Sequence, residues 1–405
     1  MDDQYSPSSV RNGRYGLPGW SYINEELFAL ERDVLFKRHW QVVCHVNDIP
    51  NKGDFRTLDL VGERALVIRG DDGVVRAFHN LCRHRASRVV AEDRGTCPGV
   101  ITCPFHAWSY DLNGRLRAAA QPSSFPKLDR DEWGLFTLEM EIWKGFVFVR
   151  FQAGPQPSVA EMMKPHEAEF NAYQIDDMIP AGDDAIYHTD TLPINWKSSR
   201  DVDNEGYHVA MAHPSLHDLY GDDYCDDPMD AWTSRSVGVF NQKPARLWSV
   251  RQYRNLVQHI EEPWSDLPQQ WLYIGLYPNT VFAFYPDSII FYQDIPHDVL
   301  TTSLRGGIYR RREESRVLKA ARYLSGRIDL DTVAEDQQLM IWSQEAVYSS
   351  AFDGIILSDL EQGVSSYHDR LRHDMPILSS VEEPGKGTLS TENNAILAAR
   401  NNPAE

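Results

Sequence analysis

The sequence has too few cysteines for a disulfide-stabilised fold and no apolar run long enough to cross a membrane. Five cysteines in 405 residues fall far below the density of small disulfide scaffolds, and a spanning helix needs about 20 apolar residues. The first residues, 1–16, are polar and lack the charged-then-apolar pattern of a secretory signal. We therefore expect a cytoplasmic protein with reduced thiols and no membrane segment.

Basic residues are outnumbered by acidic ones. Lys and Arg total 40 against 59 Asp and Glu, which gives a formal net charge of −19. Nucleic-acid binding needs clustered Lys and Arg against phosphate, so we expect no nucleic-acid partner. An acidic surface is compatible with a basic electron-donor protein or a cationic ligand, although solubility alone explains most such charges.

The sequence does contain two mixed pairs of cysteine and histidine, Cys82-x-His84 and Cys103-x-x-His106. Two thiolates and two imidazoles are the ligand set of a Rieske [2Fe–2S] centre, in which Cys holds one iron and His the other. Zinc also binds two Cys and two His, but zinc fingers usually group like residues, whereas each pair here mixes the two types. The pattern favours the Rieske cluster. Cys97 has no histidine partner in its Cys-Pro-Gly context, so we interpret it as a loop residue.

A second group of candidate ligands lies in residues 201–217, DVDNEGYHVAMAHPSLH. His208 and His213 are five residues apart, which on a regular helix separates them by about 140°. His213 and His217 have better helical spacing, but Pro214 disfavours a regular helix at His213. Spacing alone leaves the choice of pair open.

The sequence around both groups resembles the α subunits of Rieske ring-hydroxylating oxygenases. Cys-Arg-His-Arg, then Cys-Pro-Phe-His-Ala-Trp-Ser-Tyr-Asp and Asn113-Gly114, are similar to the cluster loops of that family. Asn195-Trp196-Lys197, followed by the two histidines, is similar to its mononuclear iron site. The resemblance covers most of the chain. It implies an α+β protein, with a small all-β Rieske domain and a larger, helix-grip-like catalytic domain whose antiparallel sheet is covered by helices.

The resemblance implies two cofactors, a [2Fe–2S] cluster and Fe(II). The cluster ligands would be Cys82, His84, Cys103 and His106, and the iron ligands would be His208, His213 and Asp336. In the resembled family the third ligand is an Asp that commonly follows an acidic residue; Asp336 follows Glu335 and matches this pattern, and Asp331 is the alternative. Two imidazoles and one carboxylate leave one face of the iron open, where O2 and substrate meet.

Glu205 lies three residues before His208. In the resembled family this position, more often Asp, accepts hydrogen bonds from the cluster His of one subunit, here His106, and the iron-ligand His of its neighbour, here His208. Glu resembles the subgroup that includes carnitine, glycine betaine and proline betaine oxygenases. Asp203 is an alternative bridge, and a further interpretation is that Glu205 only orients His208. A bridge between subunits implies a homotrimeric ring.

Hydrophobic periodicity divides the chain into four parts. Residues 1–37 are a lead-in that packs on the catalytic domain, with a helix over 24–37; residues 38–153 form the Rieske domain, residues 154–380 the catalytic iron domain, and residues 381–405 a polar, loosely held tail. Strands are predicted over 55–60, 65–70, 74–78, 146–151, 233–240, 270–277, 280–286, 288–295 and 303–311, and a helix over 313–350.

Aromatic residues concentrate in the expected catalytic domain. They are Tyr207, Trp232, Trp248, Trp271, Tyr273, Phe282, Phe284, Tyr285, Phe291 and Tyr292. An aromatic cage binds a quaternary ammonium by cation–π attraction, but the same residues stack on a benzenoid ring or form a core. With Glu205 and the acidic balance, they favour an ammonium or betaine substrate over an aromatic acid. Arg200 is a candidate partner for a substrate carboxylate or for a salt bridge.

The expected activity is that of a terminal oxygenase. It would hydroxylate or N-demethylate a small molecule with O2 and NAD(P)H-derived electrons. A separate reductase, with or without a ferredoxin, would deliver them, because the chain has no Gly-rich dinucleotide fingerprint. The alternatives are a benzoate-type mono- or dioxygenase, a Rieske electron carrier without oxygenase activity, and a zinc-stabilised binding module.

Overall fold

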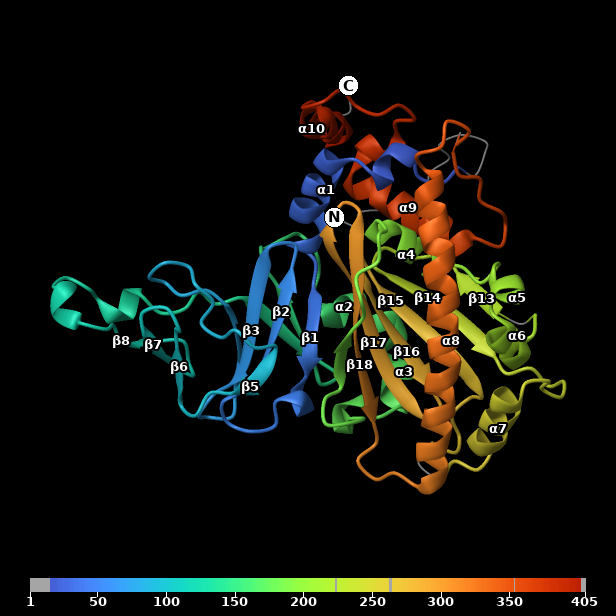
Figure 1. Cartoon of the computed structure of the whole chain (residues 1–405), viewed down its shortest axis with the longest axis horizontal. Coiled ribbons are helices and arrows are strands. Elements are labelled where there is room, and N and C mark those ends of the chain that lie inside the picture. Colours follow the sequence, from blue (N-terminus) through green and yellow to red (C-terminus); the bar gives the residue numbers. More distant parts are fainter. Residues whose placement is uncertain (1–14, 223, 262–263, 353, 402–405) are drawn as a thin grey trace. The chain divides into compact units, whose positions relative to one another are not determined.

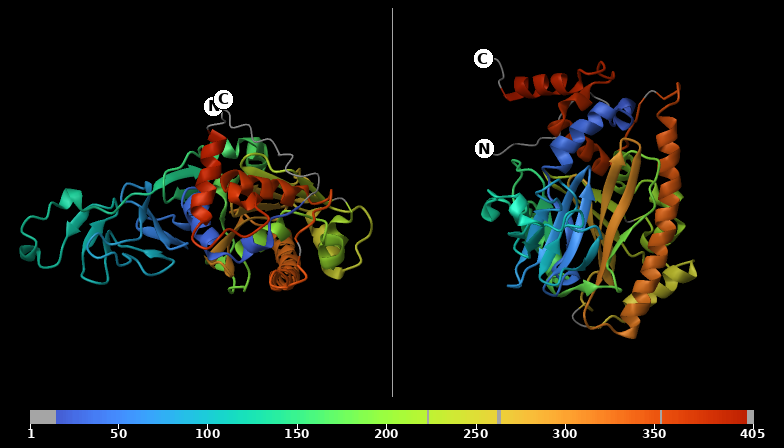
Figure 2. Two further views of the ribbon diagram at one scale, coloured as in Figure 1. Left: turned by 90° about the horizontal axis from the view of Figure 1, so that it is seen from above. Right: turned by 60° about the vertical axis from the view of Figure 1, so that its left-hand side comes forward.

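The structure, a computed structural model, describes residues 15–222, 224–261, 264–352 and 354–401. Figure 1 shows its helices and strands, and Figure 2 shows them from two other directions. Among the described helices, none combines the length and the apolar character that crossing a bilayer requires.

The chain folds into two compact units. The larger unit comprises the described residues of 1–34, 162–174 and 186–405, and the smaller unit comprises residues 35–161 and 175–185. The larger unit is thus formed from three segments of the chain and the smaller unit from two.

The smaller unit is built from short antiparallel strands. They are β1 (Gln41–His45), β2 (Asp54–Leu60), β3 (Glu63–Arg69), β4 (Val75–His79), β5 (Arg94–Thr96), β6 (Val100–Thr102), β7 (Ser109–Asp111), β8 (Leu116–Ala118), β9 (Glu139–Trp143) and β10 (Phe146–Arg150). They form sheets in the orders β1-β10-β9, β4-β3-β2-β5 and β6-β7-β8. The strands predicted from alternating hydrophobicity correspond to β2, β3, β4 and β10, so the all-β expectation is confirmed.

The β9–β10 hairpin shows how local sequence sets strand pairing. Lys144 and Gly145 connect the strands with φ angles of 48° and 77°, and Trp143 pairs with Phe146 across the turn. Two successive positive φ angles are the type I′ geometry, whose twist matches that of antiparallel strands.

The larger unit contains a twisted antiparallel sheet. Its strands are β12 (Ile186–His188), β13 (Tyr224–Asp227), β14 (Thr233–Val239), β15 (Gln270–Leu276), β16 (Thr280–Tyr285), β17 (Ser288–Asp298) and β18 (Thr301–Arg310). They lie in the order β13-β14-β15-β16-β17-β18, and β12 also pairs with β18. The five strands predicted between residues 233 and 311 correspond to β14 to β18, because their apolar and aromatic residues are spaced for a sheet.

The described part of the chain also contains α-helices. They are α1 (Glu25–Glu31), α2 (Val159–Met162), α3 (Glu167–Ala172), α4 (Trp196–Asp203), α5 (Val209–Ala212), α6 (Pro214–Tyr220), α7 (Trp248–Val257), α8 (Arg316–Ala346), α9 (Gln362–Asp374) and α10 (Leu389–Asn401). Helix α8 begins at a cap in which Ser315 Oγ accepts a 3.1 Å hydrogen bond from the Leu318 amide. It crosses one face of the sheet (Figures 1 and 2), and its 31 residues extend about 46 Å.

The predicted helix over 24–37 is present in two parts, since α1 continues into a π-helix over Arg32–Phe36. Glu31 at the end of α1 is fully buried. Its carboxylate accepts hydrogen bonds of 2.6 Å from Lys197 Nζ and 2.8 Å from Trp196 Nε1. These buried contacts connect α1 to the start of α4, within the larger unit.

The expectation of a loosely held tail over 381–405 is wrong for its described part. Residues Leu389–Asn401 form α10, in which Leu389 and Asn393 are buried. Asn393 Oδ1 accepts a hydrogen bond of 3.3 Å from the Ile377 amide. The two buried residues lie four apart on one side of the helix, and the polar composition of the other sides concealed this pattern in the sequence.

Candidate functional site

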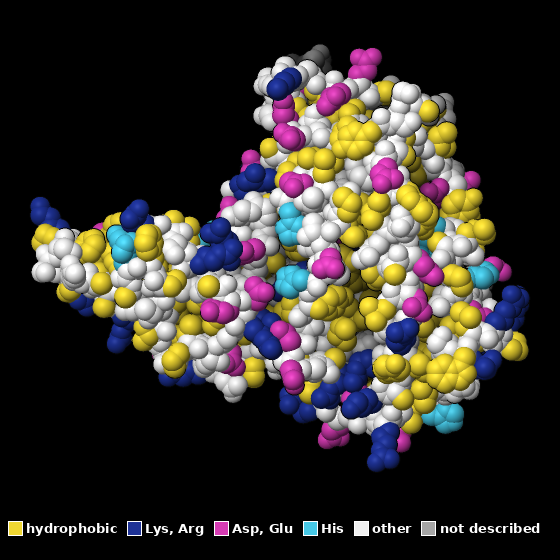
Figure 3. Space-filling view, in the orientation of Figure 1, with side chains coloured by type: hydrophobic (Ala, Val, Ile, Leu, Met, Phe, Trp, Pro, Cys, Tyr) yellow, Lys and Arg dark blue, Asp and Glu magenta, His cyan; other side chains and the backbone are white. Residues whose placement is uncertain are grey.

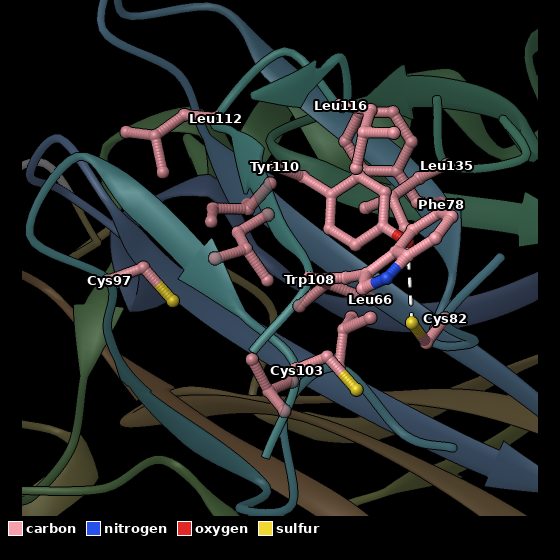
Figure 4. Packing of buried hydrophobic residues seen from close by; sticks show 14 of the residues in the cluster. Leu66, Phe78, Cys82, Cys97, Cys103, Trp108, Tyr110, Leu112, Leu116 and Leu135 are labelled. Carbon is pink, nitrogen blue, oxygen red and sulfur yellow. Dashed lines mark hydrogen bonds between the residues drawn. The ribbon is translucent and has the colours of Figure 1, made fainter. Parts of the chain in front are cut away.

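The two cysteines of the first motif lie in the core of the smaller unit. Cys82 and Cys103 are each 2% exposed, and their sulfur atoms are close enough for a side-chain contact. Tyr110 Oη lies 3.3 Å from Cys82 Sγ and accepts a 3.1 Å hydrogen bond from the Arg83 amide. Figure 4 shows both thiols on the same side of the buried hydrophobic core and Cys97 well away from them. The structure therefore brings together the predicted pair, Cys82 and Cys103, without Cys97.

Each cysteine opens a turn of the same construction. The Cys82 amide donates to Ser87 O and the Ala86 amide donates to Cys82 O, at 2.7 and 2.9 Å. In the second loop the Cys103 amide donates to Trp108 O and the Ala107 amide donates to Cys103 O, at 2.8 and 3.0 Å. Both alanines have left-handed φ angles, 58° and 55°. The two turns thus hold Cys82 and Cys103 at equivalent backbone positions, and the following His stands two residues after the first Cys and three after the second.

The histidines of the motif face each other across these turns. The rings of His84 and His106 lie 4.7 Å apart between centroids, and His84 stacks on Trp108 at 5.1 Å. His84 Nδ1 is buried without a hydrogen-bond partner among the described residues. Burial, together with His106 and Arg85, lowers the pKa of His84, which favours the neutral imidazole that a metal binds.

Two free thiols and two converging imidazoles fit a [2Fe–2S] cluster with mixed ligands. Burial raises the pKa of the Cys82 thiol when it is unliganded. A metal ligand would need to be the thiolate, so a cluster bound there would supply the positive charge that this buried position lacks.

The second candidate centre lies where the helices of the larger unit are interrupted. Helix α5 ends at His213, whose φ and ψ are −119° and 83°, and α6 starts at Pro214. The interruption turns His213 back toward His208, and the two Nε2 atoms are 3.0 Å apart. The sequence expectation of a distorted turn is therefore correct, and it explains how histidines five residues apart can meet.

Asp336 on α8 completes this group. Its Oδ1 lies 2.9 Å from His213 Nε2 and 3.5 Å from His208 Nε2. One atom from each side chain lies within 4.8 Å of the others, and among the described residues no other three His, Cys, Asp or Glu side chains bring their ligand atoms this close together. Two imidazoles and one carboxylate on one side of a point are the donor set of non-haem Fe(II) sites.

The Nδ1 atom of each imidazole forms a hydrogen bond with a glutamate. His208 Nδ1 donates to Glu205 Oε1, and Glu205 Oε2 accepts from the His208 amide at 3.1 Å. His213 Nδ1 donates to Glu335 Oε2 at 2.8 Å. Such contacts fix the tautomer, so that both Nε2 atoms are directed toward Asp336. Sequence reasoning treated Glu335 only as the residue before Asp336 and missed this contact.

The charges at this centre favour a cation. Burial lowers the pKa of His208, but the carboxylates of Asp336 and Glu205 outweigh burial and raise the pKa to about 10. The carboxylates of Asp336 and Glu205 therefore favour positive charge at this position, and a divalent metal ion would supply it. The residues therefore fit the iron expected from the sequence.

The alternatives weighed from the sequence lie elsewhere. Asp331 has a 54% exposed side chain, 3.9 Å from Arg327. Asp203 accepts hydrogen bonds of 2.5 Å from both Arg200 Nη2 and Tyr292 Oη. Arg200 is itself buried between Asp203 and Asp294, so it forms a salt bridge and is not free for a substrate carboxylate.

A cavity of about 180 Å³ opens on the His208, His213 and Asp336 side chains. Tyrosines dominate its wall: Tyr187, Tyr220, Tyr224, Tyr273, Tyr285 and Tyr292. Three of them were predicted from the strands, whereas Tyr187, Tyr220 and Tyr224 were missed. Of the other predicted aromatics, Phe282, Phe284 and Phe291 are buried in the core, and Tyr207 and Trp248 are exposed.

Two segments of this chain match known protein families. Residues 39–129 match the Rieske [2Fe-2S] domain and residues 167–376 match the ring hydroxylating alpha subunit, catalytic domain. The glycine betaine monooxygenase oxygenase subunit of Chromohalobacter salexigens is 33% identical over 262 residues, 64% of this chain and 53% of that protein. The carnitine monooxygenase oxygenase subunit of Escherichia coli K12 is 31% identical over 205 residues, 50% of this chain and 53% of that protein.

The chain thus spans about half the length of these curated relatives. A crystal structure of the quaternary ammonium Rieske monooxygenase CntA in complex with L-carnitine shares the fold, with a TM-score of 0.72 and 24% identity. The similarity covers 89% of this chain and 95% of that one. The two matched domains account for both expected cofactors. The Rieske domain binds a [2Fe–2S] cluster, and the catalytic domain binds a non-haem Fe(II). By sequence over more than half its length, the chain belongs to the family of ring-hydroxylating oxygenase alpha subunits.

Proposed function

We propose that the protein is the terminal oxygenase component of a multicomponent Rieske system. It uses O2 and NAD(P)H-derived electrons to hydroxylate a small organic substrate, and electrons come from a separate reductase, with or without a ferredoxin. The observation that carries the proposal is the convergence of His208, His213 and Asp336 in the wall of a tyrosine-lined cavity. This arrangement holds a substrate beside an iron with an open coordination face.

The proposed ligands follow from the geometry of the two centres. Cys82, His84, Cys103 and His106 hold the cluster, and His208, His213 and Asp336 hold the iron. When bound, the cluster supplies single electrons and the iron supplies the site of O2 activation. The residues of the chain orient these groups: Glu205 and Glu335 fix the imidazoles, and the cavity gives the substrate a place beside the proposed iron ligands.

Glu205 is proposed to connect the centres of neighbouring copies in a homotrimer. Its side chain is 11% exposed, and Tyr207 and Met211 beside it are 58% and 90% exposed. At the cluster, Phe105 next to His106 is 55% exposed. Both positions are thus accessible to another copy, in which His106 would donate a hydrogen bond to Glu205.

The substrate class is proposed to be a quaternary ammonium or betaine compound. The tyrosine-lined cavity offers aromatic faces to a cation, and the curated relatives are named for glycine betaine and carnitine. An aromatic acid is the second candidate, because tyrosines also stack on a benzenoid ring. Arg200, the residue predicted to pair with a substrate carboxylate, is buried in salt bridges with Asp203 and Asp294. It is therefore not available to the carboxylate of an aromatic acid.

A turnover screen tests the proposal. Iron-loaded protein with NADH and a surrogate reductase is offered quaternary ammonium compounds (choline, betaines and carnitine) in one panel and benzoate-type acids in another, and O2 uptake and products are measured. We expect substrate-dependent O2 uptake with hydroxylated or dealkylated product, and three irons with two acid-labile sulfides per chain. Two irons per chain without O2 uptake indicate an electron carrier instead, and a colourless zinc protein indicates a binding module.

A Glu205→Gln variant tests the bridge separately. It is expected to retain the iron content and the spectrum of the reduced cluster but to lose turnover, because the amide accepts only one well-directed hydrogen bond in place of two. Full turnover in this variant, with the native iron content, contradicts the bridging role.

A further inference from the structure

One carboxylate in the cavity wall has no positively charged neighbour. Asp329 on α8 lines the cavity, and its Oδ1 accepts a 2.9 Å hydrogen bond from Tyr285 Oη. In the part of the chain that the structure describes, no Lys, Arg or His contributes to its electrostatic environment. The proposed oxygenase function does not use this carboxylate.

The other carboxylates of the wall each have a cationic partner. These pairs are Asp203 with Arg200, Glu205 with His208, and Asp336 with His208 and His213. Among the described residues that line the cavity, none is a lysine or an arginine. The wall is therefore acidic overall, and Asp329 is its uncompensated charge. Figure 3 shows that acidic and basic side chains otherwise intermix over the drawn face of the molecule.

The hydroxyl groups of the cavity are arranged in a chain toward Asp329. Tyr220 Oη lies 3.2 Å from Tyr273 Oη, which lies 3.5 Å from Tyr285 Oη. Trp271 stacks on Tyr285 at 3.9 Å between ring centroids and 16° between planes, so the Tyr285 ring cannot turn freely. The result is a rigid aromatic wall around one anionic group, a combination that binds organic cations.

Asp329 is separated from the iron-ligand position along a single helix. It precedes Asp336 by seven residues, two helical turns, which places both side chains on one face of α8 about 10 Å apart. Thr332, Val333 and Asp336 on that face also line the cavity. A molecule in the cavity can therefore contact Asp329 at one end and reach the His208–His213–Asp336 group at the other.

We propose that Asp329 is the counter-ion for the positively charged group of the substrate, and that the cavity selects organic ammonium compounds that carry no carboxylate. This inference rests on the proposed oxygenase function. It narrows the proposed substrate class to ammonium compounds without a carboxylate. A betaine or a carnitine brings a carboxylate into a wall that already holds four. That wall offers no Lys or Arg, and its two histidines already contact Glu205 and Asp336, so the added carboxylate has no free cationic partner there.

The protonation behaviour of Asp329 agrees with this role. Burial raises the pKa of its carboxyl to about 7, although the Tyr285 hydrogen bond opposes the rise. A carboxylate in this condition is stabilised when a cation arrives, because the incoming charge replaces the missing partner.

Direct binding to the metal-loaded, full-length protein tests the inference without electrons or O2. The probes are choline, its neutral isostere 3,3-dimethylbutan-1-ol, and glycine betaine, measured by calorimetry under anaerobic conditions. We expect choline to bind more tightly than either other compound, by about tenfold or more, because only choline brings a cation to Asp329 without adding a carboxylate to the wall. Equal binding of choline and the isostere, tighter binding of glycine betaine, or no choline binding overturns the inference.

The Asp329→Asn variant assigns the effect to this residue. It is expected to lose at least about tenfold in choline affinity while isostere binding stays unchanged. Asp331→Asn is the matched control, because Asp331 is on the same helix but exposed, and it is expected to leave both affinities unchanged. Unchanged choline affinity in a folded Asp329→Asn protein, judged by its iron content and melting temperature, overturns the inference. Binding that behaves as expected without substrate-dependent O2 uptake instead contradicts the oxygenase function alone.

Discussion

Glu335 and Asp336, consecutive residues of α8, contact opposite nitrogens of one imidazole. Glu335 Oε2 accepts from His213 Nδ1 at 2.8 Å, and Asp336 Oδ1 lies 2.9 Å from His213 Nε2. Consecutive residues point about 100° apart on a helix, so the ring of His213 lies in the angle between the two side chains. One short segment of α8 thus supplies a proposed metal ligand and the group that orients another.

Glu335→Gln is predicted to weaken iron binding at the mononuclear site. The amide retains a contact with His213 Nδ1 but removes the negative charge that favours the Nδ1–H tautomer, and losing such a partner typically costs 10- to 100-fold in metal affinity. Competition with a chelator, followed by iron analysis, measures the change. Glu345→Gln, on an exposed position of the same helix, is the control. Equal iron retention by both variants contradicts an orienting role for Glu335.

Tyr110→Phe is predicted to lower the reduction potential of the cluster. Tyr110 Oη lies 3.3 Å from Cys82 Sγ, and hydrogen bonds to cluster sulfurs stabilise the reduced, more negative state. A potentiometric titration followed by electron paramagnetic resonance measures a drop on the order of tens of millivolts, where 59 mV corresponds to a tenfold change for one electron. Tyr323→Phe, which alters an exposed tyrosine, is expected to leave the potential unchanged. A potential that stays at the wild-type value in Tyr110→Phe excludes the hydroxyl as a tuning group.

Local patterns made much of the fold predictable. Short runs rich in apolar and aromatic residues, bounded by turn residues, located β2 to β4 and β14 to β18. The Cys-x-His and Cys-x-x-His pairs located the cluster loops, and Pro214 correctly predicted the break that lets His213 meet His208. In each case the informative residues are close together in sequence.

Contacts over long sequence distances were not predictable in the same way. The His213 contact with Glu335 spans 122 residues, and no spacing rule connects the two positions. Tyr187 and Tyr220 enter the cavity from β12 and α6, outside the strands that suggested an aromatic pocket. Asp329 belongs to an acidic helix, where a solvated carboxylate is the ordinary expectation, and only the assembled cavity shows that it faces inward.

Lys197→Met is predicted to destabilise the larger unit strongly. Lys197 Nζ and Glu31 Oε1 are 2.6 Å apart, and both side chains are fully buried. Removing one partner leaves the other charge uncompensated, which costs about 3–5 kcal/mol, whereas replacing both with apolar or neutral groups is often nearly neutral. Urea unfolding of Lys197→Met, Glu31→Gln and the double variant measures these differences. A single variant as stable as the wild type contradicts a paired, charged state at this position.

His45 is predicted to make the smaller unit less stable in mild acid. The side chain is fully buried, and its Nδ1 accepts a 3.2 Å hydrogen bond from the Asn47 amide, which requires an unprotonated nitrogen. Burial lowers the pKa of His45 to about 4, although a backbone contact with Ile175 opposes the shift. Between about pH 6.5 and pH 4 the unfolded chain therefore binds a proton at this residue that the folded protein does not. Stability then rises with pH in this window and is lost as the pH falls through it.

Titration of His45 is expected to lower the free energy of unfolding by about 2 kcal/mol between pH 7 and pH 5. This figure follows because pH 5 lies about 1.5 units below the pKa of His in the unfolded chain, and each unit corresponds to about 1.4 kcal/mol. Urea unfolding at both pH values measures it, with His45→Asn as the test variant, because Asn also accepts a hydrogen bond from the Asn47 amide but cannot titrate. The pH dependence of His45→Asn is expected to be shallower than that of the wild type by this amount. His259→Gln, at an exposed histidine, is expected to retain the wild-type slope. If His45→Asn and the wild type lose stability equally on acidification, His45 is not the group that takes up the proton on unfolding.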